Sequence, residues 1–142
     1  MSNYSHNGRR RVVITGIGAV TPLGNHVASS WDGLVSGRSG AATIEQWDAS
    51  EYPVTFACEL KNFDPKEWIE HKQARRMDRF AQMIVAAARQ AESDSGLQVE
   101  PEAERIGASI ATGIGGLQAF QDCYDVLLAG GPDRVNPFSI PQ

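Results

Sequence analysis

Two cysteines and three histidines are the first candidates in this sequence for a nucleophile or a base, since acidic pairs such as Glu67 and Glu70 are typical of a solvated helix face. Cys58 and Cys123 lie far apart and form no CxxC pair, so neither a metal site nor a disulfide framework is predicted. Neither cysteine stands beside a base or at the start of a predicted helix, where a thiolate would be favoured, and both are predicted to be buried structural thiols. His6, His26 and His71 are not near a triad-like arrangement. By their chemistry, these residues form no catalytic set.

Two glycine-rich segments raise the alternative of a small nucleotide-binding module. Gly16-x-Gly18 follows an apolar run, as in dinucleotide-binding folds, but Thr21 and Pro22 interrupt the turn where the helix should begin. Gly113-Ile114-Gly115-Gly116 is not followed by the Gly-Lys-Ser/Thr of a P-loop. Phosphate binding is therefore disfavoured, and failure to bind any dinucleotide in calorimetry would exclude it.

Composition sets further limits on the class of protein. The chain has 142 residues, 42% of them hydrophobic and 21% charged, which is ordinary for a globular protein. A net charge of −4 disfavours wholesale nucleic-acid binding. No apolar stretch approaches the roughly 20 residues of a membrane span, and the polar residues 1–10 have no signal-peptide core. We expect a cytoplasmic, reduced protein with a flexible tail over 1–10.

Two strands are predicted to lie at the centre of a layered α/β protein. The run Val12–Val20 is β-branched and apolar without alternation, which predicts a buried strand of a parallel sheet. Gly16 and Gly18 indicate close backbone packing or positive φ angles. Residues Ile106–Thr112 predict a second strand, and residues 54–60 a weaker one.

Apolar spacing and capping residues predict the helices. Asn25 can cap a helix that ends before Gly37, and Asp64-Pro65 is typical of a helix start. The strongest pattern runs from about 77 to 95 and ends at Gly96. It contains three alanines, 86–88, that would permit close approach of a neighbouring element. A further helix over about 117–130 carries one apolar stripe, which consists of Leu117, Phe120, Tyr124, Leu127 and Leu128.

Four ordered strings resemble the β-ketoacyl-acyl-carrier-protein synthases, and synthase II of bacterial fatty-acid synthesis most closely. They are Val12 to Gly24, Arg75-Arg76-Met77-Asp78-Arg79-Phe80, Thr112-Gly113-Ile114-Gly115-Gly116, and Gly130-Gly131-Pro132 with Asn136-Pro137-Phe138. The resemblance covers residues 11 to 141 and implies that 11–142 is the N-terminal portion of a ketosynthase domain. The implied fold is thiolase-like, with stacked α-β-α-β-α layers, incomplete here and normally in a homodimer. The stop at Gln142, soon after an apolar segment, suggests a chain cut short.

The resemblance also implies a reaction. An acyl chain passes from the phosphopantetheine of acyl carrier protein to an enzyme cysteine, and malonyl-carrier protein then loses carbon dioxide and attacks the thioester. No metal or cofactor other than the carrier's phosphopantetheine is implied. The family's cysteine and two histidines match no residue of this chain, so the chain alone is expected to be inactive.

Five residues match positions with a role in the family, and a sixth departs from its pattern. Ile114 matches a residue lining the acyl pocket, the alternative being that it only packs its loop. Phe138 matches the first aromatic of a Pro-Phe-Phe string near the dimer interface, where Ser139 departs from the pattern and puts the far wall of the pocket in doubt. Lys72, Arg75 and Arg76 match a basic patch that docks the acidic carrier protein, the alternative being a solvated helix start.

A non-catalytic relative remains possible on sequence grounds. The chain-length-determining partner of aromatic polyketide synthases, or a polyketide ketosynthase subunit, would share the fold. A cysteine after the next strand would indicate a synthase, whereas glutamine would indicate the inert partner.

Overall fold

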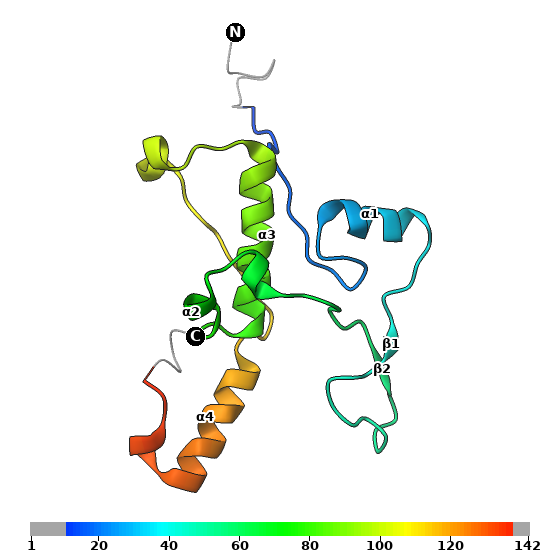
Figure 1. Cartoon of the computed structure of the whole chain (residues 1–142), viewed down its shortest axis with the longest axis vertical. Coiled ribbons are helices and arrows are strands. Elements are labelled where there is room, and N and C mark those ends of the chain that lie inside the picture. Colours follow the sequence, from blue (N-terminus) through cyan, green and yellow to red (C-terminus); the bar gives the residue numbers. More distant parts are fainter. Residues whose placement is uncertain (1–10, 138–142) are drawn as a thin grey trace.

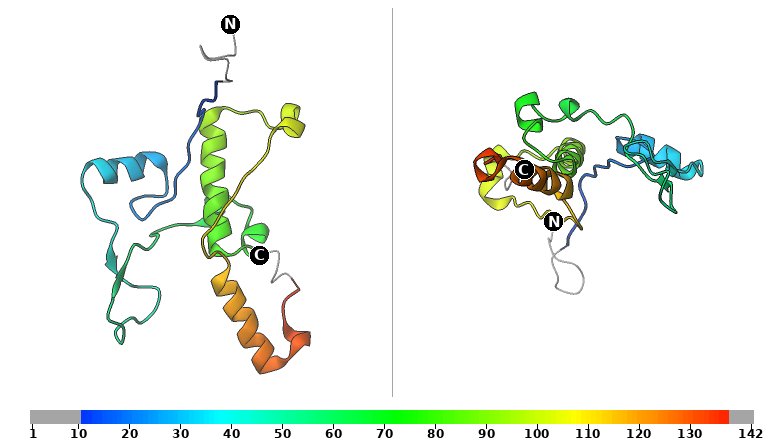
Figure 2. Two further views of the ribbon diagram at one scale, coloured as in Figure 1. Left: turned by 180° about the vertical axis from the view of Figure 1, so that it is seen from behind. Right: turned by 90° about the horizontal axis from the view of Figure 1, so that it is seen from below.

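The computed structural model describes residues 11–137, and a single long helix forms its axis (Figure 1). This helix, α3, spans Arg79–Ser95, and a second helix, α4 (Leu117–Gly130), begins close to its N-terminal end. Helix α1 (Val27–Val35) lies to one side, joined to an arm that contains a small sheet. A short helix, α2 (His71–Ala74), lies against the lower part of α3, as the two further views also show (Figure 2). Three 3₁₀ turns complete the described chain: η1 (Pro65–Glu67), η2 (Glu100–Arg105) and η3 (Pro132–Arg134).

The helix over about 77–95 is confirmed as α3, with its start two residues later than predicted. Asp78 occupies the N-cap position with extended backbone, and Gly96 ends the helix with φ 64°, a left-handed conformation that glycine adopts without strain. Ala86 is completely buried and Gln90 nearly so. The alanine-rich face is therefore the one that other segments approach.

The prediction of a buried strand over Val12–Val20 is wrong for this structure. The segment has no strand pairing, and the apolar side chains of its first half are exposed: Val12 by 91%, Val13 by 64% and Ile14 by 85%. A strand needs a partner for its backbone N–H and C=O groups, and no other described segment lies beside this one as a ladder. Instead, the N–H of Ile17 donates to Oδ2 of Asp94 at 2.9 Å, and that of Ala19 to Oε1 of Gln90 at 3.5 Å.

The close packing predicted at Gly16 and Gly18 is confirmed, and neither glycine has a positive φ. A Cβ atom at Gly16 would collide with the backbone of Ala91 and Ser95, and one at Gly18 with the backbone of Ala87. The small residues of the segment and of α3 therefore let the two main chains lie in contact.

The second predicted strand, Ile106–Thr112, is also absent. It is an extended, exposed connection between η2 and α4, with Ile110 65% exposed. The physical reason is the same, because no described strand pairs with it. The helix that follows is confirmed as α4, and it ends at Gly131, whose φ is 78°.

The arm and α1 depart from the prediction in detail. His26, and not Asn25, is the N-cap of α1, while Nδ2 of Asn25 donates to the carbonyls of Lys61 and Asn62. The strand predicted over 54–60 is reduced to β2 (Phe56–Ala57). It pairs antiparallel with β1 (Ala42–Thr43), with Ala42 opposite Ala57. Asp64 caps η1 as predicted, since its Oδ1 accepts from the N–H of Lys66 at 3.0 Å.

The core of the described chain is small. Its buried apolar residues are Ala49, Phe63, Ile69, Ala74 and Ala86. The accessible surface is 11580 Å², whereas a compact monomer of 15.4 kDa exposes about 7,200 Å². Residues 1–10 and 138–142, outside the described range, account for at most about 2,400 Å² of that difference. The described segments therefore leave uncovered much apolar surface that a compact domain would bury.

Candidate functional site

An apolar groove of about 760 Å³ lies where the first turn of α3 meets α4 and the loop before it. Its lining consists of Phe80, Ile114, Gly115, Gly116, Leu117, Ala119, Phe120, Cys123, Tyr124, Leu127 and Val135. No carboxylate, histidine, lysine or arginine is among these residues. The groove is therefore suited to binding an apolar chain rather than to acid–base chemistry.

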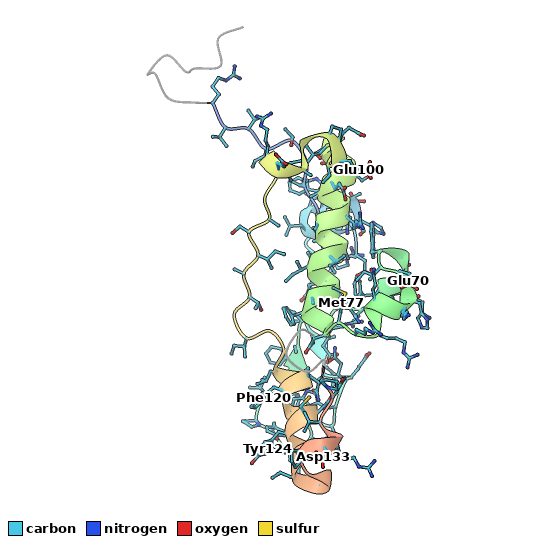
Figure 3. All side chains as sticks on the ribbon, turned by 90° about the vertical axis from the view of Figure 1, so that its left-hand side faces the viewer. Glu70, Met77, Glu100, Phe120, Tyr124 and Asp133 are labelled. Atoms are coloured by element: carbon cyan, nitrogen blue, oxygen red, sulfur yellow. The ribbon has the colours of Figure 1, made fainter. Side chains whose placement is uncertain are left out.

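The stripe predicted on α4 forms one wall of this groove. Phe120 and Tyr124 lie one helical turn apart and point to the same side of α4, as the side-chain view shows (Figure 3). Leu117 and Leu127 extend the wall in both directions. Phe120 is 70% exposed, so this wall is open to an incoming ligand.

The glycine loop that carries Ile114 also lines the groove. A Cβ atom at Gly115 would lie 2.8 Å from the ring of Phe80 and from the side chain of Thr112, so only glycine fits there without a shift. Gly116 has φ 81° and is the N-cap of α4. This tight turn leaves the Ile114 side chain 79% exposed, on the groove.

The three basic residues singled out from the sequence lie together in the chain around α2. Lys72, Arg75 and Arg76 are all exposed. Oε2 of Glu70 caps α2 by accepting from the N–H of Gln73 at 3.2 Å. Nε2 of Gln82 in α3 donates to the carbonyls of Ala74 and Met77 at 2.9 and 3.1 Å. The basic patch is thus fixed to the same end of α3 that borders the groove.

Sequence reasoning did not find Asp78, Phe80 or Gln82 as residues that organise this region. Oδ2 of Asp78 accepts from the N–H of Ala119 in the first turn of α4, at 3.3 Å. The position of Asp78 just before a helix was a visible signal for an N-cap. The sequence held no signal that its side chain reaches a different helix 41 residues away.

The remaining candidate residues are placed as follows. Phe138 and Ser139 lie outside the described residues. The prediction that both cysteines are buried is wrong for Cys58, which is exposed because the short β2 leaves it uncovered, whereas Cys123 is half-buried on the groove. Across residues 11–137, no group of histidine, cysteine and acidic side chains could hold a metal ion. Over the same range, no helix has the length and apolarity to cross a bilayer.

Comparison with known proteins identifies the class. Residues 9–140 match the family described as "Beta-ketoacyl synthase, N-terminal domain", and the chain belongs to this family. It is 46% identical over 134 residues to 3-oxoacyl-[acyl-carrier-protein] synthase 2 of Coxiella burnetii, covering 94% of this chain and 32% of that protein. It is 45% identical over 135 residues to the synthase 2 of Synechocystis, with the same coverage. The chain thus spans about a third of the length of the curated relatives it matches.

Solved structures of the same class have a similar fold. The ishigamide ketosynthase/chain length factor superposes with a TM-score of 0.76 at 34% identity, covering 94% of this chain and 34% of that one. A β-ketoacyl synthase from Burkholderia phymatum gives 0.67 at 30% identity, covering 93% and 33%. A type II polyketide ketosynthase in complex with its acyl-carrier protein gives 0.75 at 26% identity, covering 93% and 34%. The chain therefore has part of the thiolase-like fold of the ketosynthases, an attribution that does not depend on burial of residues 12–20.

Proposed function

We propose that this chain is the N-terminal portion of a 3-oxoacyl-acyl-carrier-protein synthase of fatty-acid elongation. The observation that carries the proposal is the apolar groove beside Ile114, in a chain 46% identical to a synthase 2. Each methylene of an acyl chain that leaves water for such a groove contributes about 0.8 kcal/mol. In this proposal, Ile114 faces the acyl chain and limits its length or gates its entry.

The reaction is a decarboxylative Claisen condensation. A cysteine thiolate takes the acyl group from the carrier's pantetheine sulfur, which leaves as a thiol after protonation. Malonyl-carrier protein then loses carbon dioxide, its carbanion attacks the acyl thioester, and the enzyme thiolate is released. The reaction needs no metal or cofactor beyond the carrier's phosphopantetheine.

This chain's own cysteines do not fit the nucleophile. Cys58 follows β2 on the arm, and Cys123 lies in the middle of α4, so neither is at a helix N-terminus where a thiolate is stabilised. The nucleophile and the two assisting histidines are therefore assigned to parts of a complete synthase that this chain does not contain. The 142 residues alone are expected to be inactive.

The basic patch of Lys72, Arg75 and Arg76 is the proposed docking surface for acyl carrier protein. All three side chains are exposed, and their positive charge can steer an acidic partner by long-range attraction. A related ketosynthase has been solved in complex with its acyl-carrier protein, which supports this partner. We place the complete enzyme in the cytoplasm as a homodimer, and the match of Phe138 to the family's interface string, from which Ser139 departs, stays a prediction.

One alternative has a specific observation in its favour. The similarity to the ishigamide ketosynthase/chain length factor, at 34% identity, is compatible with a polyketide ketosynthase subunit or its non-catalytic partner. Such a protein would use the same groove to set the length of a polyketide chain. The non-catalytic partner would not elongate any acyl-carrier-protein substrate by itself. The polyketide ketosynthase subunit would prefer polyketide intermediates to saturated acyl chains.

A hybrid synthase tests the proposal. In it, residues 11–137 of this chain replace the aligned segment of the Coxiella burnetii synthase 2. The proposal expects it to convert saturated acyl-carrier protein and malonyl-carrier protein to the 3-oxoacyl product, with turnover within about tenfold of the parent. A folded, dimeric hybrid that forms no product from any saturated acyl chain would contradict it.

A further inference from the structure

Asp78 lies at the point where the N-terminal ends of two helices meet. It is the N-cap residue of α3, yet its side chain makes no capping hydrogen bond within α3. Its Oδ2 atom instead accepts from the backbone N–H of Ala119, the third residue of α4, at 3.3 Å. One carboxylate therefore stands beside the positive ends of both helix dipoles.

Helix α4 has no cap of its own. Its N-cap residue is Gly116, which has no side chain to accept from the free N–H groups of the first turn. The adjacent residue, Gly115, lies against the Phe80 ring and has no room for a Cβ atom. Asp78 thus supplies, from a distant part of the sequence, the acceptor that the glycine loop cannot.

The bond lies beside the groove. Phe80 comes two residues after Asp78 on α3, and Ile114 comes five residues before Ala119, and both line the groove. Ala119 itself is part of the lining. If the bond between Asp78 and Ala119 is lost, the first turn of α4 keeps the packing of Gly115 and Gly116 on the Phe80 ring but loses a polar contact that fixes its distance from α3.

We propose that Asp78 is a positioning residue for chain-length selection: by capping α4 across the helix–helix contact, it sets the spacing between Phe80 and the Ile114 loop. This inference rests on the proposed function, since it takes an acyl chain to be the ligand of the groove. Asp78 does not contact the acyl chain itself. It acts through α4 and the Ile114 loop.

Three variants of the hybrid synthase test this role. Asp78→Ala removes the acceptor, whereas Asp78→Asn keeps an oxygen that can accept from the Ala119 N–H. Asp125→Asn makes the same chemical change at an exposed site of α4 away from the groove. Measured quantities are the hydrogen exchange of residues 114–120 and the kcat and KM for hexanoyl- and hexadecanoyl-carrier protein.

The expected result has two parts. In Asp78→Ala, exchange over 114–120 rises by roughly fivefold to tenfold, as for the loss of a helix cap. The ratio of kcat/KM between the two acyl lengths changes by a similar factor, through KM, while KM for malonyl-carrier protein stays the same. In Asp78→Asn, both the hydrogen exchange and the acyl-length preference stay close to the wild-type values. Asp125→Asn resembles the wild type.

Other results would overturn the inference. Unchanged exchange in Asp78→Ala would show that the bond does not hold α4. Raised exchange with an unchanged length preference, or an equal loss for both acyl lengths, would show a purely structural role. Failure of the proposed function is seen separately, because the hybrid without any variant would then be inactive.

Discussion

Gly18 lies against the main chain of α3, so close to Ala87 that a Cβ atom at position 18 would overlap the Ala87 carbonyl group. This contact brings the segment over 12–20 onto α3, which contributes Phe80 to the groove and whose Gln82 holds the chain that carries the basic patch. The site thus depends on a glycine far from it in the sequence.

Substitution Gly18→Ala should destabilise the fold. The added methyl group meets backbone atoms, which cannot rotate away, so the segment or α3 must shift. Overpacking of this kind costs about 1–3 kcal/mol of unfolding free energy. We expect a lower midpoint of urea denaturation in the hybrid synthase.

Gly107→Ala is the matched control for this change. Nothing lies within 4 Å of a Cβ atom at Gly107, and its φ is not positive. This variant should denature at the wild-type midpoint or slightly above it, because alanine restricts the unfolded chain. Equal midpoints for the Gly18 and Gly107 variants would refute the proposed contact between Gly18 and α3.

Charge reversal at Arg75 and Arg76 should weaken docking of the carrier protein. In the double variant to glutamate, we expect KM for acyl-carrier protein to rise about tenfold, with kcat changed less than about twofold. High salt should reduce the difference, since exposed charges are screened. Lys61→Glu, an exposed site on the loop after β2, makes the same charge change as either single arginine variant and is the control for Arg75→Glu and for Arg76→Glu taken singly. An unchanged KM in the double variant would remove the docking role.

Enlarging Ile114 should shorten the preferred acyl chain. The side chain is exposed on the groove, so Ile114→Phe fills space that a long chain would occupy. We expect kcat/KM for hexadecanoyl-carrier protein to fall about tenfold or more, with little change for hexanoyl-carrier protein. Leu97→Phe, on an exposed apolar residue beyond α3, should change neither value. Equal losses for both chain lengths would favour the alternative that Ile114 only packs its loop.

The 142-residue chain alone should neither condense nor accept an acyl group. Cys58 and Cys123 have no helix N-terminus beside them to stabilise a thiolate. Incubation with hexadecanoyl-carrier protein should leave the intact mass of the chain unchanged. A mass increase of one acyl group, removed by hydroxylamine and absent in a Cys58 or Cys123 variant, would contradict our assignment of the nucleophile.

The helices could be predicted because their signals are local. The spacing of apolar residues, Asp78 before α3 and Gly96 after it determine where that helix begins and ends. The same holds for α4, whose apolar stripe was predicted, although the groove that most of the stripe lines was not. The strings shared with the family directed attention to Ile114, which lies on a loop that lines the groove.

The strands could not be predicted in the same way. Val12–Val20 and Ile106–Thr112 have the composition of buried strands, but a strand forms only where another segment offers hydrogen bonds to its backbone. In the described chain, Asp94 and Gln90 take that place for Ile17 and Ala19. The contact between Asp78 and Ala119 could not be predicted from the sequence either, because the two residues are 41 positions apart and only the fold brings them together.

Photo-crosslinking tests the central claim, that the groove beside Ile114 holds the acyl chain, most directly. A hexadecanoyl-carrier protein with a diazirine near the end of its acyl chain is bound to the hybrid synthase, irradiated and digested. We predict labelled peptides from residues 114–127, with the label lost in Ile114→Phe. Labelling elsewhere in the synthase, with none on these residues, would contradict the account.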